Sequence, residues 1–132
     1  MIVVDTSAAI AALASRPVDE RLVRRLRDDG DLHAPHLIDV EVIHVLRRLV
    51  AKGELTIERA EDVRSDFADL AITRYPQHPL ADRMWDLEPS LTAYDASFVA
   101  LSEAVGAPLV TCDARLAAAG GQQASIELFE PR

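Results

Sequence analysis

The sequence predicts an α/β fold with a mainly parallel central sheet, and two observations support this expectation. Short runs of aliphatic and β-branched residues recur along the chain, and each is followed by a segment with helical features. Strands that alternate with helices favour crossover connections, which leave the strands parallel and place helices on the faces of the sheet. Strands are expected at residues 2–4, 32–34, 71–75, 109–112 and 126–129.

The helices are predicted from their capping residues and from the glycines that end them. Asp5-Thr6-Ser7 offers N-cap chemistry to the first helix, whereas Pro17 can open the second and Gly30 can end it. Thr56 and Thr92 are suited to cap two later helices. The expected helices cover residues 8–14, 17–28, 37–52, 56–70, 80–87, 93–105 and 113–119, with a Gly120-Gly121 loop after the last.

Length and composition restrict the class of protein. A chain of 132 residues without repeats, low-complexity stretches or Gly/Ser linkers predicts one domain over residues 1–132. An apolar content of 49% excludes a disordered chain, and the apolar runs are too short to span a membrane. No signal peptide is visible, and Cys112 has no second cysteine with which to form a disulfide. We therefore expect a cytoplasmic protein.

The charge balance is acidic, with 14 Lys and Arg against 22 Asp and Glu and a formal net charge of −8. This balance argues against simple electrostatic binding to nucleic acid. A polyanionic partner would need either a local basic face or a bridging cation.

Four acidic residues stand next to apolar sequence. Asp5 and Asp113 each follow an expected strand, so both lie at the carboxyl edge of the sheet, where ligands bind in open α/β folds. Glu41 borders the apolar stripe of the helix at 37–52, and Asp95 heads an apolar face of the helix at 93–105. Each acid also has an ordinary explanation as an N-cap, a boundary residue or a first-turn acid.

Together these four acids suit a site for a hard divalent cation. Carboxylates crowded into one cleft raise one another's pKa values, and a cation removes that penalty. Oxygen ligands favour Mg²⁺ or Mn²⁺ over Zn²⁺, and such an ion can activate water for attack on a phosphodiester. Glu41 and His44 have the spacing of a di-iron ligand pair, but such centres need two of these pairs and the chain has one.

The acids occur in an order and spacing that resemble a PIN domain, in particular the VapC-like toxin ribonucleases of toxin–antitoxin pairs. The matching segments are residues 2–7, 34–47, 91–103 and 109–116, which together span nearly the whole chain. The resemblance implies a three-layer α/β/α sandwich and a Mg²⁺- or Mn²⁺-dependent endoribonuclease. It also implies a small protein antitoxin as partner and a homodimer.

The resemblance also implies a role for individual residues. Asp5, Glu41, Asp95 and Asp113 would line one metal site and carry catalysis, with Thr6 or Ser7 hydrogen-bonded around Asp5 and Thr111 orienting the neighbouring acid. Arg115 is placed to contact substrate phosphate or to support the site. Tyr94 and Trp85 could stack on a base, although we expect each to lie in the core. The arginines between residues 16 and 27 are interleaved with acids and are expected on a solvated face.

Two other functions remain open at this stage. One is a PIN nuclease of RNA maturation or DNA processing, which would share the fold and the acids. The other is a non-enzymatic receiver-like signalling module, which has a similar size and charge. Lys52, at the end of a helix, is the only lysine of the chain, and its position argues against the late lysine of such a module.

Overall fold

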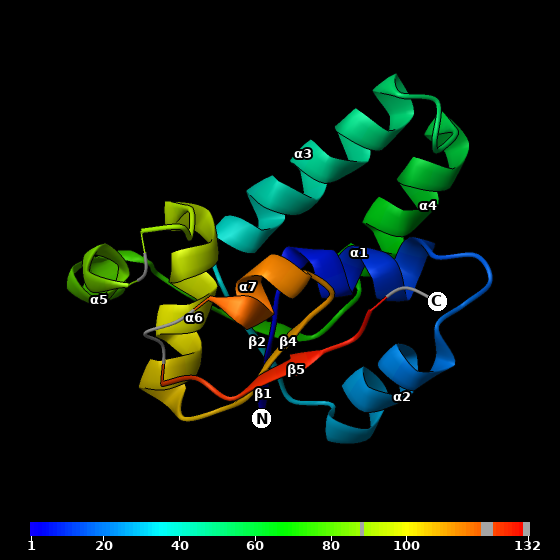
Figure 1. The fold of residues 1–132 in the computed structure, drawn as a ribbon. Helices are drawn as coiled ribbons and strands as arrows, with labels where there is room; N and C mark the ends of the chain where they lie inside the picture. Colours follow the sequence, from blue (N-terminus) through cyan, green and yellow to red (C-terminus); the bar gives the residue numbers. More distant parts are fainter. Residues whose placement is uncertain (88, 120–122, 131–132) are drawn as a thin grey trace.

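The computed structural model describes residues 1–87, 89–119 and 123–130, and its centre is a five-stranded sheet (Figure 1). All strand pairs are parallel, and the strand order is β3-β2-β1-β4-β5. The strands are β1 (Ile2–Val4), β2 (Leu32–Pro35), β3 (Ile72–Tyr75), β4 (Leu109–Thr111) and β5 (Ile126–Leu128). The expected parallel sheet is therefore confirmed, and its order reverses direction between β1 and β4.

Helices cover the sheet on two sides, which confirms the three-layer arrangement. Figure 1 shows α5 and α6 on one side of the sheet and α1 and α2 on the other, while α3 and α4 lie side by side and extend beyond the sheet. The helices are α1 (Thr6–Ala14), α2 (Glu20–Asp29), α3 (Leu37–Ala51), α4 (Ile57–Ala68), α5 (Ala81–Asp86), α6 (Ala93–Val105) and α7 (Ala114–Ala118), with a 3₁₀ turn, η1 (His78–Leu80), before α5.

Most helix boundaries lie within two residues of the sequence prediction, and the start of α2 differs most. Helix α2 begins at Glu20 rather than at Pro17, because the Asp19 carboxylate accepts a hydrogen bond from the Leu22 N–H and so caps the first turn. The helix expected over residues 80–87 is the short helix α5, and the turn η1 directly precedes it. The expected Gly120-Gly121 loop lies outside the described residues. The described part of the chain contains no helix long and apolar enough to cross a membrane.

The core is centred on β1, β4 and α6. All three residues of β1 and of β4 are buried, and the run from Ala96 to Ser102 in α6 is buried throughout. Helix α6 packs against β1, β2 and β4 and returns the chain to the start of β4, so it runs opposite to the strands. The first turn of α6 therefore lies at the carboxyl edge of the sheet, the same edge at which Asp5 and Asp113 leave β1 and β4.

Candidate active site

The four acids identified in the sequence come from four elements that meet at one edge of the sheet. Asp5 follows β1 and caps α1, and Asp113 follows β4 and caps α7. Glu41 lies in the second turn of α3, and Asp95 in the first turn of α6. Electrostatic coupling connects three of these pairs: Asp95 acts on both Asp5 and Glu41, and Asp113 acts on Asp95.

Asp5 is the most buried of the four, with 5% of its surface exposed. Its Oδ1 accepts hydrogen bonds from the Ala8 N–H at 2.9 Å and the Ser7 hydroxyl at 2.7 Å, while Thr111 donates to Oδ2. Burial nevertheless raises the pKa of Asp5 to about 6, because the three donors do not offset the loss of water, and the charge of the nearby Asp95 raises the pKa further. The three donors leave one acceptor position on Oδ2 for a ligand.

Two hydroxyls, of Ser7 and Thr111, join the start of α1 to the end of β4. The Ser7 hydroxyl accepts from the Cys112 N–H at 2.9 Å, and the Thr111 hydroxyl accepts from the Asp113 N–H at 2.9 Å. Because both hydroxyls also donate to Asp5, they hold that carboxylate and the Asp113 backbone in one fixed arrangement.

Glu41 is held by Thr6, the first residue of α1. The Thr6 hydroxyl donates to Glu41 Oε1 at 2.8 Å, so Thr6 contacts Glu41, while Ser7 is the residue that bonds to Asp5. Burial is the main cause of the raised pKa of Glu41, and Asp95 adds to it. The Thr6 hydrogen bond and the charge of His44 act in the opposite direction.

Asp95 is the centre of the repulsion among the acids. Its pKa is raised first by burial and then by the charge of Asp113, whereas Thr92 and Arg115 lower it. The N-termini of α1, α6 and α7 all point to this edge, and their partial positive charges stabilise the carboxylates. Helix dipoles and hydroxyl donors thus stabilise carboxylates that would otherwise repel one another.

The chemistry of the donors fits a hard divalent cation. Carboxylate and hydroxyl oxygens line the edge, and the raised pKa values mean that the ionised acids lack compensating positive charge. Among the residues that the structure describes, no group of three or more His, Cys, Asp or Glu side chains lies close enough together to hold a metal ion.

Asp5 and Asp113 serve both as helix N-caps and as members of the candidate site. Asp5 and Asp113 use Oδ1 to cap their helices, which orients each side chain and leaves Oδ2 for other contacts. Asp39, two residues before Glu41, is partly exposed and pairs with Arg74 at 2.6 Å. The Arg115 guanidinium is 92% exposed and approaches Asp113 Oδ2 at 3.5 Å.

The prediction that the two aromatic residues lie in the core was wrong. Trp85 is 88% exposed and Tyr94 is 58% exposed. Trp85 lies on a helix of six residues that is too short for a reliable periodicity, and Tyr94 precedes the buried part of α6. The expected solvated face is confirmed at four exposed arginines, Arg16, Arg21, Arg24 and Arg27. Arg25 is the exception, because it is partly buried and pairs with Glu127 at 2.8 Å.

Comparison with known proteins identifies the family. A profile of the PIN domain matches residues 2–122. The VapC ribonuclease Mb0985 of Mycobacterium bovis is 43% identical over 96% of both chains, and ribonuclease VapC1 of Mycobacterium tuberculosis is 41% identical over 96% of both. The chain therefore belongs to the PIN-domain family, among its VapC ribonucleases. This membership leaves the receiver-like module without support.

Solved structures agree on the fold. PAE2754 from Pyrobaculum aerophilum superimposes with a TM-score of 0.70 at 23% identity, over 95% of this chain and 81% of that one. Mycobacterium tuberculosis VapC20, described as a sarcin-ricin loop cleaving toxin, has a TM-score of 0.62 at 18% identity, over 95% and 99% of the two chains. At these identities the likeness concerns the sheet and its helices, which confirms the PIN-like sandwich.

Asp5→Asn should stabilise the metal-free protein at neutral pH. Asparagine resembles the neutral acid and keeps an acceptor for Ala8 and Ser7. Folding raises the pKa of Asp5 from 3.8 to about 6, so the ionised carboxylate destabilises the folded protein. This destabilisation is absent below pH 4, grows as the pH rises and is complete above about pH 6. We expect the variant to unfold with a free energy up to about 3 kcal/mol higher at pH 7.5.

Chemical denaturation in a chelator, at pH 4 and at pH 7.5, measures this difference. The two proteins should be nearly equal in stability at pH 4. A stability difference of the same size at both pH values would contradict the assigned origin of the penalty.

Proposed function

We propose that this chain is a Mg²⁺- or Mn²⁺-dependent endoribonuclease that acts as a growth-inhibiting toxin until a small antitoxin binds it. Support for the activity comes from the VapC ribonucleases that it resembles at 41–43% identity. Support for the site comes from one observation above all. The buried Asp5 carboxylate accepts hydrogen bonds from three donors and its pKa is still raised. A bound cation would supply the positive charge that this carboxylate lacks.

The proposed roles follow from how each acid is held. Asp5 and Asp95 would be the most direct metal ligands, with Glu41 and Asp113 binding directly or through water. A bound divalent cation would lower the pKa of water and stabilise the charge that develops on the scissile phosphate. Ser7 and Thr111 fix the Asp5 carboxylate, and Thr6 fixes Glu41, so that neither has to reorganise during the reaction.

Substrate would enter on the side that carries Arg115. This guanidinium is exposed and close to the acids, so it can bind a phosphate without leaving the site. Without the cation, the cluster repels the RNA backbone, in keeping with the net charge of −8. We therefore infer that RNA binding and metal binding are coupled.

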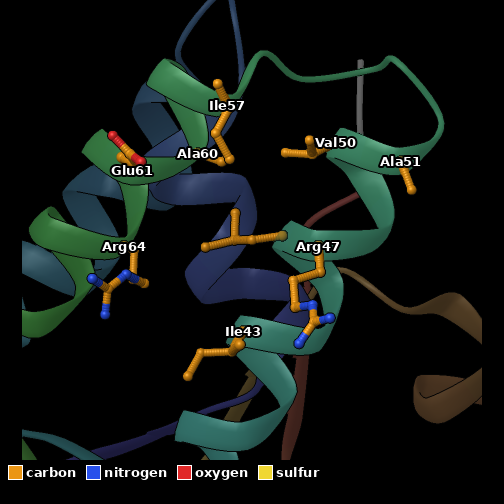
Figure 2. A pocket seen from close by; sticks show the side chains of 9 residues that line it. Ile43, Arg47, Val50, Ala51, Ile57, Ala60, Glu61 and Arg64 are labelled. Atoms are coloured by element: carbon orange, nitrogen blue, oxygen red, sulfur yellow. The ribbon is translucent and has the colours of Figure 1, made fainter.

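The groove between α3 and α4 is the proposed seat of the antitoxin. It has a volume of about 620 Å³, and Figure 2 shows Ile43 and Val50 of α3 facing Ile57 and Ala60 of α4 across it. An exposed apolar hollow of this kind suits the apolar face of an amphipathic helix. Ile43, which is 44% exposed, contributes to the groove from outside the buried face of α3 formed by Ile38, Val42 and Leu46.

Charges at the rim of the groove define the partner further. Arg47 and Arg64 line it together with Glu61, so a bound helix would present more acidic than basic residues there (Figure 2). Docking on α3 also brings the antitoxin to the helix that carries Glu41.

The homodimer, the single domain over residues 1–132 and the cytoplasmic location stay predictions.

Asp5→Asn and Asp95→Asn should each abolish metal-dependent cleavage. Total RNA incubated with antitoxin-free protein should be cut in the presence of Mg²⁺ or Mn²⁺ and remain intact in EDTA. Each variant should lower the cleavage rate on the order of 100-fold or more, because each removes charge from the metal site. Asp39→Asn is the matched control, since Asp39 lies on α3 near Glu41 but pairs with Arg74.

The control should cleave like the unaltered protein, and sequencing of the new RNA ends would map the cut. Cleavage that survives in both Asp5→Asn and Asp95→Asn would refute the assigned site. Equal cleavage with and without EDTA would refute the metal requirement.

Ile57→Glu should release the antitoxin without harming cleavage. Ile57 is 55% exposed in the groove, so the folded protein tolerates a charge there, but an apolar partner helix would bury it. Binding of a cognate antitoxin, to be sought in the reading frames next to this gene, should weaken at least about ten-fold. Calorimetry with that protein measures the change, with Val18→Glu as a control at an exposed valine outside the groove.

Unchanged affinity in Ile57→Glu, or an equal loss in Val18→Glu, would place the antitoxin elsewhere. Loss of ribonuclease activity in Ile57→Glu would show that the substitution damages the fold instead.

A further inference from the structure

Tyr94 is an exposed aromatic residue beside the proposed catalytic acids. It directly precedes Asp95 in the first turn of α6, and 58% of its surface is exposed. Its backbone C=O accepts a hydrogen bond from the Ser97 hydroxyl at 2.6 Å, which ties it to the buried part of the helix. Within the described residues its ring makes no aromatic stack or cation–π contact, so the ring faces solvent.

Position makes this exposed ring a candidate for substrate contact. Residues 94 and 95 are about 100° apart around the helix axis, so Tyr94 borders the face from which Asp95 points. Both lie at the carboxyl edge of the sheet, with Asp113 close enough to raise the pKa of Asp95. A polynucleotide whose phosphate reached these acids would pass the Tyr94 ring.

Arg115 provides the complementary contact. Its guanidinium is 92% exposed, and its charge lowers the pKa of Asp95, so it lies within electrostatic range of the acid next to Tyr94. The acids are thus accompanied by one exposed cation and one exposed aromatic ring. This pair matches the two parts of a nucleotide, because phosphate binds guanidinium and the base stacks on an aromatic face.

We propose that Tyr94 stacks on an unpaired base next to the scissile phosphate, and so selects single-stranded RNA at the cut. The inference rests on the proposed function and adds a specificity-determining residue to it. A base within a duplex is stacked on its neighbours and cannot reach the ring, whereas a base in a loop or a free strand can. Because every base has a π face, Tyr94 selects for an unpaired nucleotide more than for its identity.

Trp85 is the matched control for exposure. It is the other strongly exposed aromatic residue of the described chain, but its helix α5 contacts α6 at a distance from Asp95. Arg83 of α5 pairs with Glu103 at 2.6 Å, and Glu103 lies eight residues beyond Asp95 in α6. At 1.5 Å per residue this contact is about 12 Å along the helix from Asp95.

The test is a comparison of Tyr94→Ala, Tyr94→Phe and Trp85→Ala on one defined RNA. The probe is a 20-nucleotide unpaired RNA that contains the cut site mapped in total RNA, together with copies that carry one abasic nucleotide each. For the unaltered protein, one abasic position beside the cut should lower kcat/KM roughly ten-fold through KM. Tyr94→Ala should lose roughly ten-fold on the intact RNA and lose nothing further on that abasic copy.

Tyr94→Phe and Trp85→Ala should behave like the unaltered protein, and annealing the RNA to its complement should suppress cleavage. The stacking role is overturned if Tyr94→Ala cleaves the intact RNA normally, or if its loss adds to the abasic loss at every position. Either result, with metal-dependent cleavage preserved, leaves the proposed function standing. Absence of cleavage by the unaltered protein would refute the proposed function itself, and the stacking role with it.

Discussion

The architecture depends on holding mutually repelling carboxylates together at the carboxyl edge of a parallel sheet. Burial raises the pKa of Asp5, Glu41 and Asp95, and coupling through Asp95 raises it further, so the folded chain carries an electrostatic penalty in the metal-free state. The fully buried strands β1 and β4 help to stabilise the fold against this penalty. The Ser7 and Thr111 hydroxyls also hold the start of α1 against the end of β4. The remainder of the core offsets this penalty at the candidate site.

Much of this arrangement could be predicted from the sequence, because local signals and the site coincide. Asp5 and Asp113 are N-caps that follow apolar strands, so the same residues mark the helix starts and the sheet edge. The contact between Thr6 and Glu41 could not be predicted, since it joins residues 35 positions apart and depends on how α3 leaves β2. The exposure of Trp85 was missed because periodicity does not determine which face of a six-residue helix is covered.

The acidic composition is consistent with an RNA-cleaving enzyme once the acids are divided by position. Setting aside Asp5, Glu41, Asp95 and Asp113 changes the formal charge from −8 to −4, so half of the excess belongs to the proposed site. Several remaining charges are paired, including Arg25 with Glu127 and Arg74 with Asp39. Among the described residues nearest the acids, Arg115 stays largely exposed and is available for phosphate. Affinity for RNA would thus be local and dependent on metal, without general adhesion to polyanions.

The most direct test of this account is a calorimetric titration of the purified, RNA-free protein with Mn²⁺. If the four carboxylates form one cation site, the unaltered protein binds Mn²⁺ and its melting temperature rises with saturation. Asp95→Asn removes the acid to which the others are coupled, so it should abolish both the binding heat and the rise, whereas Asp39→Asn should retain both. Mn²⁺ binding of equal affinity in Asp95→Asn and in the unaltered protein would contradict the central claim.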